Sequence, residues 1–429
     1  MPKKAEDSLS IGDFSGMKRI AVWGLFGQMN LGNECTAEAL LANLKRLVPS
    51  ADVLMICSDP GDAGVRHEIP AQSIFASYSG DERSRNRSRS KRLLARLLRA
   101  VFRGIPREVE SWWRTLGALK DVDLLAMAGT GMLTDWGTSA RSYPYAIFKW
   151  TLCGRLRGCK VRFLSVGVGP LRQRMSRFFI KASLSLADYC SYRDEESKIL
   201  MGQHGYDTSK QHVFPDLAFS LPVRLFQLSS GRDANDSGHK AVVGVGVMDY
   251  YGRFGIKKNN ESIYERYMAK TSDFVAWFVE NGYRVRVLQG DMRYDTKPRA
   301  DLKSRLEKRG ITYGESIVDD DVTGVGDLLA QIEQTDVVIS PRFHNLLLSI
   351  MYSKPVISIS YDTKCDSLME GVGFAKYCQR IEELDVERLI KQFRELERNI
   401  ENLRSASAQC SAEYRKLLDE QYGLVLSGR

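Results

Sequence analysis

Short, almost continuously apolar runs alternate with helix-like segments along most of the chain, and this alternation constrains the fold more than any other feature. Each run is followed by a turn that contains glycine or polar residues. Continuous apolar runs are typical of parallel strands that are covered by helices on both faces of a sheet. In the first half, the strand candidates are 19–26, 52–58, 123–129, 161–169 and 188–194, and the helix candidates are 34–48, 176–187 and 194–205.

The alternation restarts after a polar stretch, 227–240, which is rich in serine and glycine and predicts a linker. The second half has strand candidates at 241–248, 283–290, 336–340 and 355–361, and helix candidates at 261–282, 326–335 and 345–353. We therefore predict an α/β protein with two Rossmann-like doubly wound domains that face each other across a cleft. The expected parts are a disordered polar tail at 1–16, an N-terminal domain at 17–226, a C-terminal domain at 241–384 and charged amphipathic helices at 385–429.

The positive charge of the chain is concentrated in one segment, 83–107. The whole chain of 429 residues has a net charge of +9, and this segment holds ten Lys or Arg residues and no acidic residue. Its part 91–102 places leucines, Val101 and Phe102 along one helical stripe, which is typical of a helix that lies on anionic lipid. A solvated insertion loop remains the alternative. Because no aromatic residue interleaves with the arginines of 83–92, no nucleic-acid partner is expected.

Cysteine and histidine usage indicates a reducing compartment and no metal. The eight cysteines show no CxxC spacing, and the five histidines show no paired ligand spacing. No run of eighteen apolar residues predicts a membrane-spanning helix, and 1–16 lacks the apolar core of a secretory signal. We expect a cytoplasmic protein, associated with the inner face of the cell membrane if 83–107 binds lipid.

Three glycine-containing turns follow strand candidates of the first domain, where open α/β sheets bind ligands. In the turn 24–34, Gly27 and Gly32 bracket the bend, and Asn30 and Glu34 are candidates for contacting a sugar-like acceptor; a tight structural turn is the alternative. In the turn 128–136, Gly129 and Gly131 permit close approach of a ligand, and Asp135 could bind hydroxyl groups or cap a helix. The third turn lies at 165–171.

Basic side chains follow two strands of the second domain. Arg342 and His344 come directly after the strand candidate 336–340, and Lys364 follows the strand candidate 355–361. In an extended turn, residues two apart point to the same side, so Arg342 and His344 would converge on one ligand. Neighbouring parallel strands would bring Lys364 close, and such a site suits a small anion with carboxylate or phosphate groups. In the first domain, Arg193 follows a strand candidate, where it either binds an anion or pairs with an adjacent acidic residue.

These turns resemble the polysaccharide pyruvyl transferase family. The stretches that carry the resemblance are GLFGQMNLGNE, AGTGMLTDW, SVGVGPL, SYRDEES, PDLAFSLP and SPRFHNLLLSIMYSKPVISISYDTK, which span about residues 20–375. The resemblance implies a glycosyltransferase-B-like fold and phosphoenolpyruvate as donor. It identifies Arg342 and His344 with the Arg-x-His donor site, Lys364 with a lysine after the next strand, and Arg193 with a second anion-binding arginine. The departures, Asn33 in place of an acid and one glycine fewer in the second turn, concern the acceptor side.

The resemblance also implies a reaction. A pyruvyl group moves from phosphoenolpyruvate to a sugar of a cell-surface polysaccharide or its lipid-linked precursor, forms a ketal and releases phosphate, with no cofactor. His344 suits the role of general acid, while Arg342, Arg193 and Lys364 would bind the donor's carboxylate and phosphate. The alternative is a nucleotide-sugar-dependent glycosyltransferase of the same architecture. A silent lipid-associated scaffold would rest on the segment 83–107 alone.

Overall fold

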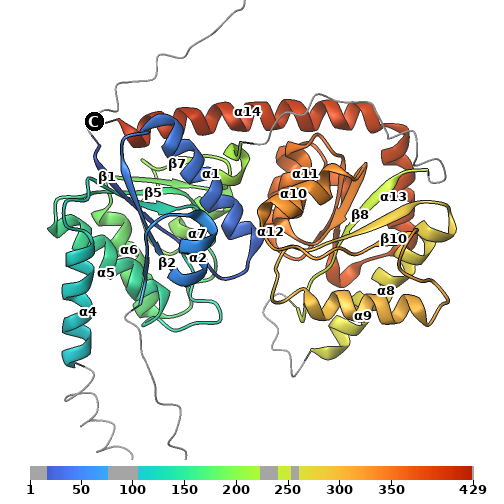
Figure 1. Cartoon of the computed structure of the whole chain (residues 1–429), viewed down its shortest axis with the longest axis horizontal. Coiled ribbons are helices and arrows are strands. Elements are labelled where there is room, and N and C mark those ends of the chain that lie inside the picture. Colours follow the sequence, from blue (N-terminus) through green and yellow to red (C-terminus); the bar gives the residue numbers. More distant parts are fainter. Residues whose placement is uncertain (1–16, 76–104, 223–239, 253–259, 428–429) are drawn as a thin grey trace, which may run out of the picture. The chain divides into compact units, whose positions relative to one another are not determined.

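The computed structural model describes residues 17–75, 105–222, 240–252 and 260–427, which form two compact α/β units (Figure 1). The expected tail 1–16, all of the basic segment except 105–107, and all of the linker except Lys240 lie outside the described residues. The first unit comprises Met1–Gln28, Leu44–Val213 and Gly423–Arg429, and the second comprises Met29–Asn43 and Phe214–Tyr422. The helices α1 (Leu31–Leu47) and α14 (Ile400–Leu426) therefore each begin in the second unit and end in the first.

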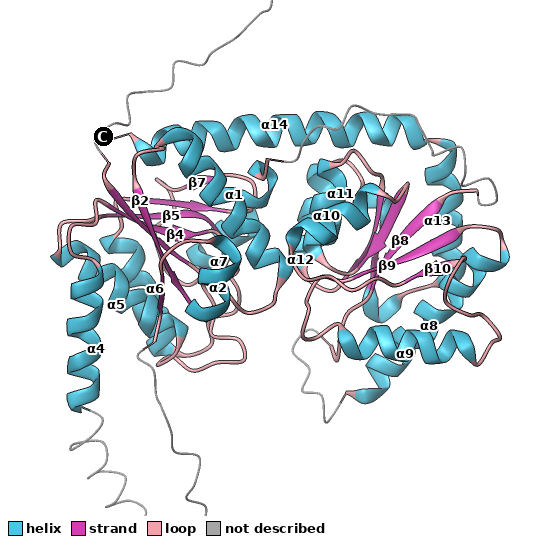
Figure 2. Ribbon diagram, viewed as in Figure 1, coloured by secondary structure: helices cyan, strands magenta, loops and turns pink. Residues whose placement is uncertain are grey.

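The first unit is built on a seven-stranded parallel sheet with the order β3-β2-β1-β4-β5-β6-β7 (Figure 2). The chain moves from β1 to one edge and later returns to the other side of β1, so the order reverses between β1 and β4. Open α/β sheets bind ligands beside the carboxyl ends of strands at such a point. The strands are β1 (Arg19–Trp23), β2 (Asp52–Cys57), β3 (Ala71–Ser73), β4 (Leu124–Ala128), β5 (Lys160–Val166), β6 (Tyr189–Tyr192) and β7 (His212–Val213).

Helices α4 to α6 of the first unit pack side by side (Figure 1). Tyr145 of α5 accepts a hydrogen bond from the indole of Trp112 in α4 at 3.0 Å, and its ring meets Phe179 of α6 edge to face. α5 is thus held between its two neighbours. Besides α1, the helices of this unit are α2 (Pro60–His67), α4 (Ile105–Ala118), α5 (Tyr143–Leu156), α6 (Arg174–Leu186) and α7 (Glu195–Gln203).

The second unit has a six-stranded parallel sheet with the order β10-β9-β8-β11-β12-β13. Here the order reverses between β8 and β11. The strands are β8 (Val242–Gly246), β9 (Arg284–Leu288), β10 (Ile317–Val318), β11 (Val337–Ser340), β12 (Val356–Ser360) and β13 (Cys378–Arg380). The helices that belong wholly to this unit include α8 (Glu261–Glu280), α9 (Thr296–Glu307), α10 (Val325–Glu333), α11 (Phe343–Met351), α12 (Thr363–Gly371), α13 (Val386–Arg398) and the short 3₁₀ helix η2 (Leu217–Ser220).

Burial explains why the apolar runs form the two sheets. Every residue of β4, β11 and β12 is buried, as expected for central parallel strands with helices on both faces. The predicted fold class, two doubly wound parallel-sheet units, is confirmed. Some predicted bounds are wrong. The first strand ends at Trp23 rather than at 26, because the chain turns at Gly24 and the ring of Phe26 lies against that glycine.

Candidate active site

Four turns of the second unit meet at the carboxyl edge of its sheet. They follow β8, β9, β11 and β12, and the turns after β8 and β11 flank the point where the strand order reverses. Because all the strands are parallel, the side chains of these turns lie at one edge. Arg342, His344 and Lys364, the residues predicted to bind and activate a donor, all belong to this edge. The contacts of each side chain determine whether it can bind an anion or transfer a proton.

Arg342 is the residue before the first turn of α11, and its backbone N–H donates to Ser340 Oγ at 3.0 Å. Its guanidinium forms an ion pair with Asp295, which lies in the turn after β9 and is completely buried. The other oxygen of Asp295 accepts the N–H groups of Gly290 and Asp291, each at 2.9 Å. Burial raises the pKa of Asp295, and Arg342 opposes that shift. Burial acts to lower the pKa of Arg342, but Asp295, with Tyr361 and Asp291, raises it overall.

The ion pair leaves donors of Arg342 for a ligand. Asp295 engages Nη2, whereas Nε is buried and has no hydrogen-bond partner among the described residues. The stem of Arg342 lies against Gly290, where a Cβ would come within 2.8 Å of Arg342 Cγ. Gly290 is therefore needed to seat this arginine. A fixed, buried guanidinium with an unsatisfied N–H is suited to recognise a carboxylate or phosphate oxygen.

His344 lies in the first turn of α11 and faces a different carboxylate. Its Nε2 is 4.0 Å from Oδ2 of Asp216, a buried residue that precedes η2. The other oxygen of Asp216 accepts the N–H of Ala218 at 3.0 Å, so the carboxylate is held by the 3₁₀ helix that it caps. A fixed carboxylate at this distance is placed to attract a positive charge on the imidazole.

Gly32 completes the surroundings of His344. A Cβ on Gly32 would come within 2.0 Å of Nδ1 of the imidazole, so the ring lies directly against the first turn of α1. The residues before it are tied to the turn after β9: Asn30 donates to Asp291 at 3.0 Å, and the N–H of Leu31 donates to the carbonyl of Gly290 at 3.2 Å. The candidates Asn30 and Gly32 therefore share a unit with the predicted donor residues.

The sequence argument that Arg342 and His344 point to one side is wrong in its geometry. It assumed an extended turn up to residue 345, but α11 already begins at Phe343. In a helix, residues two apart do not share a face. Arg342 accordingly turns toward Asp295, and His344 turns toward Gly32 and Asp216. The structure places both at the same strand end, with their side chains against different neighbours.

Lys364 lies in the first turn of α12 among aromatic rings. Its Nζ is 4.9 Å from the ring centre of Tyr361 and 5.9 Å from that of Phe343. The ring of Tyr361 also meets that of Tyr250, from the turn after β8, with 6.4 Å between the centres. Phe343 in turn contacts His344 edge to face. These rings form a partly apolar wall that links Lys364 to the catalytic candidate His344 and strengthens electrostatic interactions beside it.

Among the first-unit candidates, Arg193 follows β6 and is largely buried. Its Nε donates to Asp194 at 3.2 Å, and Gly167 seats the guanidinium, because a Cβ there would come within 2.6 Å of Nη2. Asp194 also caps α7 through the N–H of Ser197. Burial opposes ionisation of Asp194, but Arg193 and Ser197 together lower its pKa. The structure thus bears out the predicted local pairing of Arg193, and anion binding by this residue stays a prediction.

Of the residues predicted in the turn after β4, Gly129 and Asp135 make structural contacts, whereas Gly131 is exposed. Gly129 is packed against β5, where a Cβ would lie 2.4 Å from the carbonyl oxygen of Leu164. Both oxygens of Asp135 accept backbone N–H groups, from Arg172 and Gln173, so this side chain holds the loop that precedes α6 and does not cap a helix. Gly131 is exposed and has open space around it. Glu34, in α1, is completely buried.

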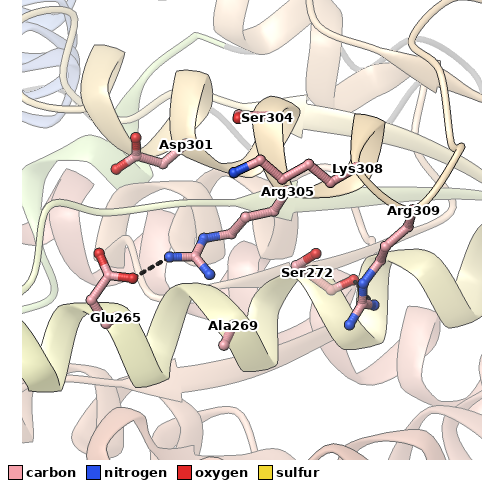
Figure 3. Close-up of a pocket in the computed structure, with 8 residues that line it drawn as sticks. All are labelled: Glu265, Ala269, Ser272, Asp301, Ser304, Arg305, Lys308 and Arg309. Carbon is pink, nitrogen blue, oxygen red and sulfur yellow. Dashed lines mark hydrogen bonds and ion pairs between the residues drawn. The ribbon is translucent and has the colours of Figure 1, made fainter.

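A charged groove of about 400 Å³ lies away from these turns, between α8 and α9 of the second unit (Figure 3). The basic residues Arg305 and Arg309 pair there with Glu265 and Asp273, so carboxylates balance the positive charge. None of the candidate residues lines the groove. Within the residues that the structure describes, no group of three or more His, Cys, Asp or Glu side chains is arranged to hold a metal ion.

Sequence reasoning assigned no role to Asp216, Asp295 or Gly290. Asp216 lies in the quoted stretch PDLAFSLP, and an Asp before an apolar run signals a helix cap, which it is. Its second role beside His344 depends on tertiary packing. Asp295 has no pattern of its own, since only the fold brings it to Arg342. Gly290 ends a strand-like run as many turn glycines do, so the close approach of Arg342 could not be inferred.

Substituting Gly32 by alanine is expected to lower turnover at least about 100-fold, because the new methyl group would displace the imidazole. Circular dichroism and thermal unfolding should show that the fold is retained. Gly326→Ala in α10 is the matched control, since a Cβ there meets nothing within 4 Å. Equal turnover in the Gly32 variant and the wild type would show that the position of His344 does not matter.

The chain matches a family model over most of its length. The model is described as polysaccharide pyruvyl transferase and covers residues 30–363. Among curated protein sequences, none matches this chain. The matched region includes the turn with Asn30 and Gly32, the residue Asp216 and the α11 turn with Arg342 and His344.

Solved structures with a similar fold include proteins from Anabaena, Rickettsia africae and Methanocaldococcus jannaschii. HepE from Anabaena, solved with UDP and glucose, is 10% identical with a TM-score of 0.55, and the match covers 96% of this chain and 100% of that one. A glycosyltransferase from Rickettsia africae is also 10% identical with a TM-score of 0.55, over 96% of this chain and 100% of that one. A UDP-GlcNAc 2-epimerase from Methanocaldococcus jannaschii is 11% identical with a TM-score of 0.54, over 88% of this chain and 92% of that one. These likenesses show a glycosyltransferase-B fold, and the family match shows that the chain belongs to the polysaccharide pyruvyl transferase family, whose members are transferases.

Proposed function

We propose that this transferase moves the pyruvyl group of phosphoenolpyruvate onto two hydroxyl groups of a sugar, forming a ketal and releasing phosphate. The observation that carries the proposal is His344, which is held between Gly32 and the buried Asp216 at the carboxyl edge of the second sheet. The acceptor sugar would belong to a cell-surface polysaccharide or its lipid-linked precursor, and the reaction would take place in the cytoplasm.

The donor would bind at the turns after β11 and β12. Phosphoenolpyruvate carries a carboxylate and a phosphate on adjacent positions of one small molecule. Arg342 offers its buried Nε–H to one of them, and Lys364 supplies a positive charge for the other. The N-terminus of α11 adds backbone N–H groups and a positive dipole end at the same edge. Arg193, in the first unit, would bind an anionic group, as the family resemblance implies.

His344 would supply the proton that the reaction requires. Protonation of the methylene carbon of phosphoenolpyruvate makes the adjacent C2 cationic, and a sugar hydroxyl then forms the first C–O bond to C2. A second hydroxyl displaces phosphate, and each hydroxyl loses its proton, so the product is a pyruvyl ketal with a methyl group.

The acceptor would bind at the exposed turns beside the strand ends. Asn30 precedes α1 beside Gly32, which contacts the imidazole, so a sugar held by Asn30 would lie near the proposed proton donor. Gly131, in the turn after β4 of the first unit, has open space for a ligand. Glu34 and Gly129 would contribute indirectly through packing, since both are buried. Asp135 would shape the same turn by binding the backbone of Arg172 and Gln173.

The direct test is phosphate release from phosphoenolpyruvate in the presence of a panel of free and lipid-linked glycans. Release that depends on one glycan, with a mass increase of the glycan equal to one pyruvyl ketal, is the expected result. Release without a change in the glycan would indicate hydrolysis, and no release with any glycan would contradict the proposal. The variant Arg305→Gln, in the groove of Figure 3, is the control for loss of a surface charge.

The second candidate is a nucleotide-sugar-dependent glycosyltransferase. It is favoured by the fold, because the similar solved structures include HepE in complex with UDP and glucose. A diphosphate would then occupy the turns that we assign to phosphoenolpyruvate. Calorimetric titration separates the two candidates: we expect heat of binding with phosphoenolpyruvate and none with UDP-sugars, and the reverse result would favour the glycosyltransferase.

A further inference from the structure

Helix α4 of the first unit exposes an apolar stripe. Ile105, Val109 and Trp113 follow one another at intervals of four residues, and each is exposed, with 68% of Trp113 accessible to solvent. The opposite face of α4 is buried through Ser111 and Thr115. An amphipathic helix in a globular protein normally turns its apolar residues toward the core. The exposed stripe of Ile105, Val109 and Trp113 therefore indicates a surface that binds an apolar partner.

Helix α6 exposes apolar and basic side chains together. Met175 and Phe178 are exposed, and Phe178 lines a hollow of about 500 Å³. The hollow is lined by three cations of α6, Arg174, Arg177 and Lys181, and none of them pairs with a carboxylate among the described residues. The groove of Figure 3 differs, because Glu265 and Asp273 neutralise two of its arginines. The α6 hollow is thus a place where positive charge and apolar surface coincide.

The two helices belong to one continuous layer. α5 packs between α4 and α6, and Tyr145 of α5 contacts both Trp112 and Phe179. α5 also leaves Leu156 exposed. Of the large apolar side chains that the described residues expose, half come from α4, α5 and α6. We call this surface, made by Ile105, Val109, Trp113, Leu156, Met175 and Phe178 with Arg174, Arg177 and Lys181, the α4–α6 face.

Much of the α4–α6 face lies toward the ligand-binding edge of the first sheet. α6 begins after the turn that follows β5, and α4 runs into β4, so both helices start at the carboxyl edge of the strands. Ile105, Met175 and Phe178 lie in the starting turns of these helices. Trp136, from the turn after β4, is exposed at the same edge. Carboxyl edges carry the ligand sites of such sheets.

We propose that the α4–α6 face docks on a membrane surface rich in anionic lipid. Exposed tryptophan and phenylalanine beside unpaired cations match a bilayer interface, where aromatic rings lie at the headgroup level and basic side chains attract acidic lipids. The hollow on α6 would receive a lipid phosphate between Arg174, Arg177 and Lys181, with Phe178 directed to the acyl region. Among the helices that the structure describes, none is long and apolar enough to span a bilayer, so the contact is peripheral.

One sequence feature supports lipid as the occupant of the α4–α6 face. The basic segment 83–107, whose ten cations carry the whole excess charge of the chain, leads directly into α4. The segment 83–107 and the α6 side of the α4–α6 face therefore both carry positive charge. Docking through this face would bring the carboxyl edge of the first sheet close to lipid headgroups, which is where a lipid-linked sugar would be presented.

The test is co-sedimentation of the full chain with vesicles of phosphatidylcholine, with or without an equal part of phosphatidylglycerol. The wild type is expected to sediment with the anionic vesicles, and less so as salt increases. Combining Arg174→Gln, Arg177→Gln and Lys181→Gln should lower the partition coefficient roughly 100-fold. Combining Trp113→Ser with Phe178→Ser should lower it at least about tenfold.

Matched variants outside the face serve as controls. Neutralising Arg305, Lys308 and Arg309 in the groove of Figure 3 removes as many charges, and Val65→Ser removes an exposed apolar side chain on α2. Both should sediment like the wild type. Unchanged sedimentation of the α4–α6 variants would overturn the proposal. A second result would also overturn it: the wild type does not sediment with vesicles but forms a dimer by light scattering, and the α4–α6 variants are monomeric. Sedimentation is measured without substrates, so the result does not depend on the proposed reaction.

Discussion

The His344→Gln variant is expected to turn over at least about 100-fold more slowly than the wild type, which is the low end for loss of an acid–base catalyst. Glutamine preserves the approximate size of the side chain between Gly32 and Asp216 but cannot deliver a proton. Affinity for phosphoenolpyruvate should be largely retained, because Arg342 and Lys364 are untouched. Turnover is measured from phosphate release, and donor affinity from calorimetry.

The Asp216→Asn variant tests how His344 is activated. Asparagine retains an oxygen for the N–H of Ala218 but removes the negative charge 4.0 Å from the imidazole. Since the carboxylate favours the protonated ring, its loss should make the ring release its proton at lower pH. A general acid is active while protonated, so the alkaline limb of the pH–rate profile should move to lower pH.

Other ionisable groups lie near Asp216, and their titration could also change the pH–rate profile. Glu34 and Cys35 of α1 are buried close by, and burial together with Glu38, Asp216 and Glu34 raises the pKa of the Cys35 thiol well above its usual value. Cys35 therefore stays neutral over the range of the assay. A purely structural role for Asp216 would lower activity equally at every pH, and an unchanged pH profile would remove the proposed coupling to His344.

The two sheets could be predicted from sequence because buried parallel strands leave a local signal. β4, β11 and β12 are continuous apolar runs that end in glycine or polar turns, so their existence required no knowledge of their partners. Helices α4 and α9 were not predicted. α9 is almost entirely polar and shows no clear apolar face, whereas the apolar stripe of α4 faces outward instead of toward the core.

The candidate site was predicted less completely than the fold. Basic residues after strands marked Arg342, His344 and Lys364, because charged side chains at the ends of buried strands are conspicuous. Their partners could not be found in this way, since Asp216 and Asp295 are ordinary aspartates until the fold brings them to His344 and Arg342. The beginning of α11 was also placed too late, and with it the direction of the His344 side chain.

The Arg342→Met variant is expected to lower the free energy of unfolding by about 3–5 kcal/mol, because it leaves the completely buried carboxylate of Asp295 without its cation. Methionine retains much of the stem that lies against Gly290. The double variant Arg342→Met with Asp295→Asn removes the buried charge as well, and it should recover a large part of the loss. Urea unfolding followed by circular dichroism measures each variant.

A pH series and an exposed ion pair identify the cause of this loss. Burial already raises the pKa of Asp295, and without Arg342 the largest opposing contribution is lost, although the hydrogen bond from the N–H of Gly290 remains. The folded variant then holds a proton more tightly than the unfolded chain, so its stability relative to the wild type should improve as the pH falls. Arg305→Met, which breaks the more exposed pair with Glu265, should cost at most about 1 kcal/mol. If the Arg342 and Arg305 variants lose the same free energy of unfolding at every pH, Asp295 is not a buried charge. Arg342 would then not be fixed by an ion pair, which contradicts the basis for the proposed donor site.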